Sequence, residues 1–194
     1  MFHKTGLGTI FSSSSNLVFL DTIFNGNVAN NKGAGACIYF VTPHVSKKSF
    51  FSFNNVYTNN YAYKGSVFYF MSNLTALSLN DYFYNNLCNT SIAELHIDGE
   101  FYINNATSFQ NIGSLGGSFN FQRRTSRCAF IIENSNFFSN TAYSGGWKFF
   151  YFNSIFYFLF FKPKPKGSIY SSKCLLNITT SHFVKNNATD GGAM

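Results

Sequence analysis

Apolar and polar residues alternate in short stretches along this chain, and each stretch ends at an asparagine-rich turn. The period of the alternation is that of a β-strand with one buried face. An aromatic residue three positions before the turn asparagine supplies a further inward side chain, and a glycine-containing bend leads into the next apolar run. The pattern predicts short strands joined by tight corners, with core-facing pairs at Phe51 and Phe53 and at Leu77 and Leu79.

The asparagine turns are copies of one repeat, aromatic-x-x-Asn-x-Ala-x-x-Gly-Gly-small, followed by an apolar run. Residues 126–146 and 172–192 are the two best copies, and they align without a gap. The third copy has Ser91 where glycine is expected, and in the fourth copy Phe109 lies two residues before its asparagine instead of three. The anchoring asparagines of the six copies are Asn27, Asn60, Asn86, Asn111, Asn140 and Asn186.

A unit of about 25 to 30 residues with short strands and sharp corners predicts one coil of a β-solenoid. Coils stacked at about 4.8 Å place Phe on Phe in the core and Asn on Asn in an amide ladder. Asparagine suits such a corner because it tolerates the left-handed conformation and its amide bonds to backbone groups. We therefore expect an all-β fold, a right-handed parallel β-helix of about six coils. The alternative is a β-sandwich of antiparallel strands, which would not need the same asparagine at each corner.

The repeat also suggests the organisation of the chain. Residues 1–15 are expected to be an N-terminal extension and residues 16–194 the repeat domain, with a loop insertion near 147–171. The apolar pair Phe130 and Ile132 is shifted by one residue relative to the early copies, which flips faces unless a bulge or an altered corner absorbs it. Because Met194 follows the last Gly-Gly closely, we expect a fragment with an open end, which continues or associates end to end.

Two of the four cysteines occupy equivalent places in consecutive copies. Cys128 precedes Asn140 by the same interval, 12 residues, as Cys174 precedes Asn186. Stacking would put their Cα atoms about 4.8 Å apart, within reach of a disulfide. The pair is either bridged, in an oxidising compartment, or present as two independent buried thiols.

The repeat resembles that of the polymorphic membrane protein family of chlamydial autotransporters, and it is similar to repeats in large Phe- and Asn-rich ciliate surface proteins. The aromatic-x-x-Asn half begins at Phe24, Tyr57, Phe83, Phe137 and Phe183, and Gly-Gly-Ala stands at 191–193. The resemblance implies a right-handed parallel β-helix at the cell surface, with an adhesive rather than an enzymatic role.

Acidic residues are scarce beside the aromatic ones: the chain has 26 Phe and 12 Tyr but only seven Asp and Glu. Glycoside hydrolysis needs two carboxylates about 5 to 10 Å apart. Asp98 and Glu100 alternate and would share a strand face, whereas Asp21 is predicted to be a corner residue because Asn54 and Asn80 occupy its place in other copies. The candidate carboxylates are Asp21, Asp81, Asp98, Asp190, Glu94, Glu100 and Glu133.

The histidines have neither metal-ligand spacing nor a neighbouring nucleophile; they are His3, His44, His96 and His182. No catalytic, cofactor or metal site is therefore predicted. The net charge of +7 reflects scarce acids, and the densest basic groups are predicted to be solvated loop charge rather than a nucleic-acid footprint. These groups are Arg123, Arg124 and Arg127, and Lys162, Lys164 and Lys166.

Localisation rests on weak signals. No secretory signal is clear, and the longest apolar run, residues 149–161, is too short to cross a bilayer as a helix. Glycosylation sequons are about as frequent as chance predicts, at Asn73, Asn89, Asn105, Asn177 and Asn187. We expect a non-catalytic segment of a surface or secreted protein with a structural or adhesive role, binding host or extracellular glycans or proteins but not nucleic acid. The alternative is a polysaccharide lyase or hydrolase.

Overall fold

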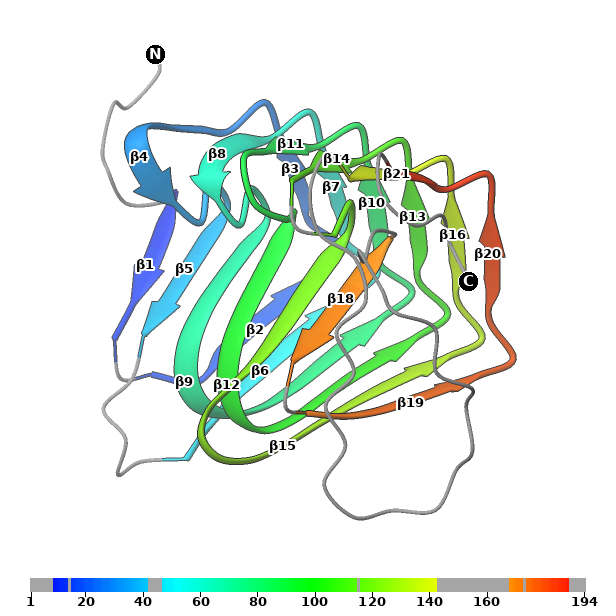
Figure 1. The fold of residues 1–194 in the computed structure, drawn as a ribbon. Coiled ribbons are helices and arrows are strands. Elements are labelled where there is room, and N and C mark those ends of the chain that lie inside the picture. The colour runs from blue at the N-terminus through cyan, green and yellow to red at the C-terminus, as the bar shows by residue number, and fades with distance from the viewer. Residues whose placement is uncertain are drawn as a thin grey trace.

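The computed structural model describes residues 9–13, 15–41, 47–114, 116–142, 168–172 and 174–188 (Figure 1). Every regular element in these ranges is a β-strand, and all recorded strand pairs are parallel. The strands form three sheets that wrap around a common axis, so the chain is a parallel β-solenoid as the repeat predicts.

The largest sheet has nine strands and bends around one corner of the solenoid. Three long strands run through the bend: β9 (Phe68–Leu79), β12 (Ala93–Asn104) and β15 (Phe119–Glu133). The shorter strands before the bend are β1 (Ile10–Ser12), β5 (Ile38–Val41) and β18 (Ile169–Ser172). Those after it are β2 (Leu17–Leu20), β6 (Lys48–Phe53) and β19 (Leu175–Thr179).

The other two sheets have six strands each, one from every coil. One comprises β3 (Ile23–Asn25), β7 (Val56–Thr58), β10 (Tyr82–Tyr84), β13 (Thr107–Phe109), β16 (Asn136–Phe138) and β20 (His182–Val184). The other comprises β4 (Val28–Ala34), β8 (Tyr61–Lys64), β11 (Leu87–Cys88), β14 (Ile112–Gly113), β17 (Thr141–Ala142) and β21 (Asn187–Ala188).

The boundaries of the solenoid differ from those expected. The described residues complete about four full turns, slightly fewer than the six coils predicted, although each smaller sheet has six rungs. Ile10–Ser12, assigned above to an extension, already pair with β5 as a rung. Ile169–Ser172 likewise pair with β15, so the end of the proposed 147–171 insertion belongs to the solenoid. Residues 147–167 and 189–194 lie outside the described residues.

The core is built around a stack of repeat aromatics. Phe24, Tyr57 and Phe83 stack face to face in consecutive coils, with ring centroids 5.0 and 5.2 Å apart. Phe137 and Phe183 continue the stack at 4.7 Å. These rings belong to the hydrophobic core that the three sheets enclose.

The fourth copy interrupts this stack, because Ser108 rather than Phe109 takes the inward position. Phe109 instead faces outward and stacks on Tyr84, with centroids 5.5 Å apart. Phe119, from the bent sheet, packs edge-on against both Phe83 and Phe137 at 5.5 and 5.9 Å and so occupies the space of the missing ring.

The apparent one-residue shift between early and late copies is not a shift of the backbone. Phe50, Ala76, Phe101 and Phe130 form one continuous inward row through β6, β9, β12 and β15. A bulge at the bend of β15, after Arg123, leaves this row in register.

The prediction that Phe51, Phe53, Leu77 and Leu79 face the core is therefore wrong. Alternation along each strand turns these four outward, and the buried positions between them hold the small residues Ser52 and Ser78. At Ser52 the hydroxyl of Tyr57 fills the interior instead, 2.9 Å from the Ser52 hydroxyl.

The six anchoring asparagines form one continuous amide ladder, as Asn140 illustrates. Its Oδ1 accepts the backbone N–H and the Nδ2 of Asn111 at 3.0 and 3.1 Å. Its Nδ2 donates to the Ser108 carbonyl and to Oδ1 of Asn186, both at 3.0 Å. The same Asn–Asn bonds join every consecutive pair from Asn27 to Asn186. Each amide from Asn60 to Asn186 thus satisfies backbone groups that the corner removes from the sheets, whereas the Asn27 amide bonds to side chains.

The left-handed conformation falls on the residue before each anchor, not on the anchor as expected. These preceding residues have φ of 51° to 67° and are Gly26, Asn59, Asn85, Gln110, Ser139 and Lys185. Turning the chain one residue earlier leaves the anchor free to direct its amide inward. A second left-handed corner precedes β3 and its equivalents, and Asp21 shares it with Asn54 and Asn80 as predicted.

The amide ladder predicts a cost for replacing Asn140 by alanine. Asn140→Ala leaves the Asn111 N–H without its acceptor in a buried corner, at roughly 1 to 3 kcal/mol, and it removes the Nδ2 donor from the Ser108 carbonyl and from Asn186. We expect chemical denaturation to show a loss of about 2 to 4 kcal/mol. Asn177→Ala, at an exposed position of β19, should cost less than about 0.5 kcal/mol. Equal small losses in both variants would contradict the ladder's role.

Candidate functional site

The candidate carboxylates are dispersed rather than paired. Asp98 is 4% exposed and Glu100 is exposed, and Gly99, with a φ of 124°, lies between them at the bend. Glu133 accepts a hydrogen bond from the Tyr102 hydroxyl on the outside of the same sheet. Asp190 lies outside the described residues.

Asp81 is buried within a second ladder, formed at the corner that follows the bent sheet. Asn55 and Asp81 occupy equivalent places in neighbouring coils, and the Asp81 carboxylate accepts the backbone N–H of Asn55 at 2.9 Å. The Ser78 hydroxyl donates to its other oxygen at 2.6 Å. Burial raises the pKa of Asp81, although hydrogen bonds from the neighbouring Ser and Asn side chains partly oppose the rise. A carboxyl group thus occupies a position that suits an amide.

One polar cluster lies on the outer face of the bent sheet, before the bend. Glu94 is 5% exposed; its carboxylate accepts the Thr90 hydroxyl at 2.5 Å and lies 2.9 Å from Nε2 of His96. Burial alone would raise the pKa of Glu94, but the hydrogen bonds from His96 and Thr90, with the nearby charges of His96 and Lys64, hold it below its ordinary value. Glu94 is therefore an ionised, oriented carboxylate at neutral pH.

The third copy's departure from the repeat creates this cluster. The equivalent corner residue in the preceding coil is Gly65, with a φ of 54°, where an added Cβ would lie 2.1 Å from the Phe68 carbonyl oxygen. Counted back from the Phe68–Ala93 pair, Thr90 takes this place, one residue before the Ser91 that sequence spacing aligns with the glycine, and its φ is not positive. The Thr90 hydroxyl is directed to Glu94. Sequence reasoning missed the site; the available signal was the missing corner glycine of the third copy, followed by Glu94 and His96 on one strand face.

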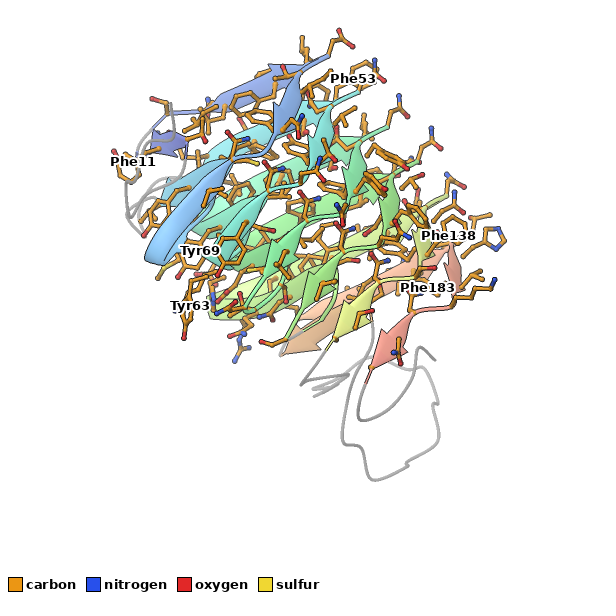
Figure 2. The ribbon with its side chains drawn as sticks, turned by 90° about the horizontal axis from the view of Figure 1, so that it is seen from above. Phe11, Phe53, Tyr63, Tyr69, Phe138 and Phe183 are labelled. Carbon is orange, nitrogen blue, oxygen red and sulfur yellow. A yellow bond between two sulfur atoms is a disulfide. The ribbon has the colours of Figure 1, made fainter. Side chains whose placement is uncertain are left out.

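Aromatic rings flank the cluster. Phe11, Tyr39 and Tyr69 form a stacked row on the same outer face, with centroids 5.6 and 5.2 Å apart, and the Tyr69 ring lies 6.1 Å from that of His96. Burial, with the nearby Glu94 and Tyr39, raises the pKa of Tyr69 to about 12. Figure 2 shows Phe11, Tyr63 and Tyr69 on one side of the solenoid, opposite Phe53 and Phe138.

The cluster holds one buried carboxylate rather than a pair. Glu94 and Asp98 are the two buried carboxylates on β12, and four residues of strand separate them by about 13 Å, beyond the 5 to 10 Å that glycoside hydrolysis requires. Glu94 can accept hydrogen bonds, and His96, partly exposed, can meet a polar group from solvent. An arrangement of this kind can hold a hydroxyl or amide group.

The structure joins Cys128 and Cys174 by a disulfide between consecutive coils, with their Cα atoms 5.0 Å apart. The two cysteines directly precede the paired segments Ala129–Glu133 and Leu175–Thr179, so the strand register itself brings them together. Cys37 and Cys88 are buried free thiols, and burial raises the pKa of each. The bridge therefore links the one pair of cysteines that the repeat places in register.

Other predicted features are dispersed or fall outside the described ranges. Arg123 and Arg127 are exposed around the β15 bulge, and His182 is exposed on β20. Side chains of Arg124, the three lysines of 162–166, His3 and His44 are not described. Within the described part of the chain, no three His, Cys, Asp or Glu side chains group as a metal site. The same part contains no helix long and apolar enough to cross a membrane.

The chain matches no protein-family model, no curated protein and no solved structure.

The disulfide predicts that a reducing agent will destabilise the protein. Residues 128 and 174 are 46 apart in sequence, so the bridge removes considerable freedom from the unfolded chain and can contribute up to about 4 kcal/mol. Denaturation with and without dithiothreitol should differ by an amount of this order. The double variant Cys128→Ser, Cys174→Ser should be insensitive to the reductant. An oxidised wild type no more stable than its reduced form would contradict the prediction.

Asp81 predicts a pH-dependent difference between the wild type and Asp81→Asn. Because the folded-state pKa of Asp81 is raised, the wild type loses stability as pH rises through that pKa. An amide keeps the acceptor for Asn55 and has no charge to bury, so Asp81→Asn should be more stable by about 1 kcal/mol at pH 7.

The advantage of Asp81→Asn should disappear at low pH, where the wild-type carboxyl is protonated; urea denaturation from pH 3 to 7 measures it. The reverse change, Asn55→Asp, is the matched control and should destabilise at pH 7 and recover in acid. An advantage for Asp81→Asn that is unchanged across this range would exclude the charge as its cause.

Proposed function

We propose that the chain is a non-catalytic solenoid segment of a surface or secreted protein, with a structural or adhesive role. The observation that carries the proposal is the disulfide between Cys128 and Cys174. Disulfides form and persist in oxidising compartments, and this one joins two coils that the strand register already aligns.

The inner architecture supports a structural role. The amides of the anchoring asparagines bond to one another between coils and form a ladder along the whole described solenoid. They are therefore occupied in holding the coils together. Exposed amide pairs add a second set on the outside, such as Asn85 with Asn59 at 2.8 Å and Asn105 with Asn80 at 2.8 Å. Such inter-coil bonds favour a rod that holds its length and spacing.

An adhesive role is supported by what the rod displays outside. Equivalent outward residues repeat at the spacing of the coils, which suits an extended partner, a glycan or a protein rather than nucleic acid. The likeness of the repeat to those of adhesive surface proteins supports the same role. The exposed Arg123 and Arg127 lie at a single bulge and form no continuous stripe with exposed aromatics.

The test is to locate the protein in its native cells and determine its thiol state there. Intact cells are treated with a protease and a membrane-impermeant label, and the protein is alkylated without reductant before peptide mapping. We expect labelling without permeabilisation and a linked Cys128–Cys174 peptide, while Cys37 and Cys88 are alkylated only after unfolding. A reduced protein protected inside intact cells would overturn the proposal.

Polysaccharide hydrolysis or elimination is the second candidate, and the Glu94–His96 pair is the observation that favours it. Release of reducing or unsaturated ends from a panel of acidic and neutral polysaccharides tests it. Under our proposal neither the wild type nor Glu94→Gln releases products. Turnover by the wild type that Glu94→Gln abolishes and Glu133→Gln retains would establish the enzyme instead.

A further inference from the structure

The outer side of the bent sheet, after the bend, carries a contiguous apolar surface. It is made of two outward rows across three neighbouring strands, one of Val18, Phe51 and Leu77 and the other of Leu20, Phe53 and Leu79. We call these six residues the apolar face. Val18 is 61% exposed and Leu20 is 52% exposed.

The fold does not require this apolar character. Equivalent outward positions further along the solenoid are Tyr102 and Asn104 on β12, then Ile131 and Glu133 on β15, then Asn177 and Thr179 on β19. The later strands occupy the same sheet with polar or mixed residues. The apolar face is thus a property of the first three coils, and its composition needs another reason.

The apolar character extends around the adjoining corner. The Phe51 and Phe53 rings are parallel within 6°, with centroids 6.3 Å apart. Beyond the corner, Ile23, Val56 and Tyr82 form a third outward row, in which Ile23 is 70% exposed. Contiguous apolar surfaces of this kind in soluble proteins mark interaction sites.

Charges of opposite sign border the face at its two ends. Lys47 is exposed just before β6. Asp21 is exposed directly after β2, where Asn54 Nδ2 donates to its carboxylate at 2.6 Å and orients it. The face therefore has a basic edge where its strands begin and an acidic edge where the first strand ends.

We propose that the apolar face pairs with the same face of a second copy of this chain. A two-fold axis in the interface, parallel to the solenoid axis, lays coil on coil with the strands of the two copies antiparallel. The basic edge of each copy then faces the acidic edge of the other. Lys47 of coil two lies one coil, about 4.8 Å, from the level of the other copy's Asp21 and can reach it, twice in one symmetric contact. The sheets pack face to face at about 10 Å, and the side chains of the two outward rows of one copy fit between those of the other copy.

This lateral pairing is independent of the compartment and role proposed above, and it differs from an end-to-end association between copies. Lateral pairing uses side chains of coils one to three, whereas end-to-end association uses backbone groups of the terminal rungs. A variant on the face therefore separates the two.

Sedimentation velocity over a hundredfold range of concentration tests the pairing. We expect the wild type to show a reversible monomer–dimer equilibrium and Val18→Asp to remain monomeric. The control is Leu175→Asp, which introduces the same charge at a 50% exposed outward position of the same sheet on β19, outside the face. Leu175→Asp should dimerise as the wild type does.

A second variant tests the charged edges without disturbing the fold. Asp21→Asn places at this left-handed corner the residue that Asn54 and Asn80 already provide there. Loss of the charge should weaken the dimer about two- to fivefold, and high salt should weaken the wild-type dimer but not this variant. Leu20→Lys replaces Val18→Asp if far-ultraviolet circular dichroism shows that the latter is unfolded.

Several outcomes would overturn the proposal. A wild type that is monomeric throughout, or one whose association is unchanged in folded Val18→Asp, excludes the lateral dimer; the latter result indicates end-to-end contact. Equal loss of association in Val18→Asp and Leu175→Asp excludes a specific face. Retrieval of a different protein by a monomeric wild type, lost in Val18→Asp, would show that the face serves another partner.

Discussion

The amide ladder of the anchoring asparagines is the constraint on which the solenoid depends. Each coil turns sharply at the anchor, and the turn removes backbone groups from the regular sheet pairing. An asparagine amide has one acceptor and two donor hydrogens, and in this fold it bonds both to the backbone and to the next amide. Shorter or apolar side chains cannot satisfy both at this depth, which explains why the corner residue repeats while its neighbours vary.

Stacking at a fixed spacing makes the core a set of rows, and a gap in one row is filled from another. Ser108 breaks the repeat aromatic stack, and Phe119 enters from the bent sheet to fill it. Ser52 leaves space on the bent sheet, and the Tyr57 hydroxyl reaches into it. Because neighbouring rows share the interior volume, volume is conserved across the coil rather than at each position.

Two acidic residues take places where the repeat has no acid, and the consequence for their pKa differs between the interior and the outer face of the solenoid. Asp81 takes a place that suits an amide, so a carboxyl group is buried and its pKa raised. Glu94 is outward but covered, and Thr90 and His96 keep it ionised. The difference arises from the donors: His96 and Lys64 add positive charge near Glu94, whereas Asp81 has only neutral partners among those that lower its pKa.

The sequence by itself determined the strands, the repeat, the anchoring asparagines and the equivalence of Cys128 with Cys174, because these follow from local periodicity and from identical spacing between copies. Tertiary structure decided which side of each strand is buried. Phe51 and Leu77 are as apolar as a core residue, and only the parallel register of β6 and β9 with β15 shows that they face outward. It also decided the Thr90–Glu94–His96 cluster, since a hydroxyl, a carboxylate and an imidazole meet there through a corner whose path depends on the neighbouring coil. The sequence shows that apolar and polar residues alternate along a strand. Which of the two strand faces lies in the interior depends on how each strand pairs with the strands of neighbouring coils.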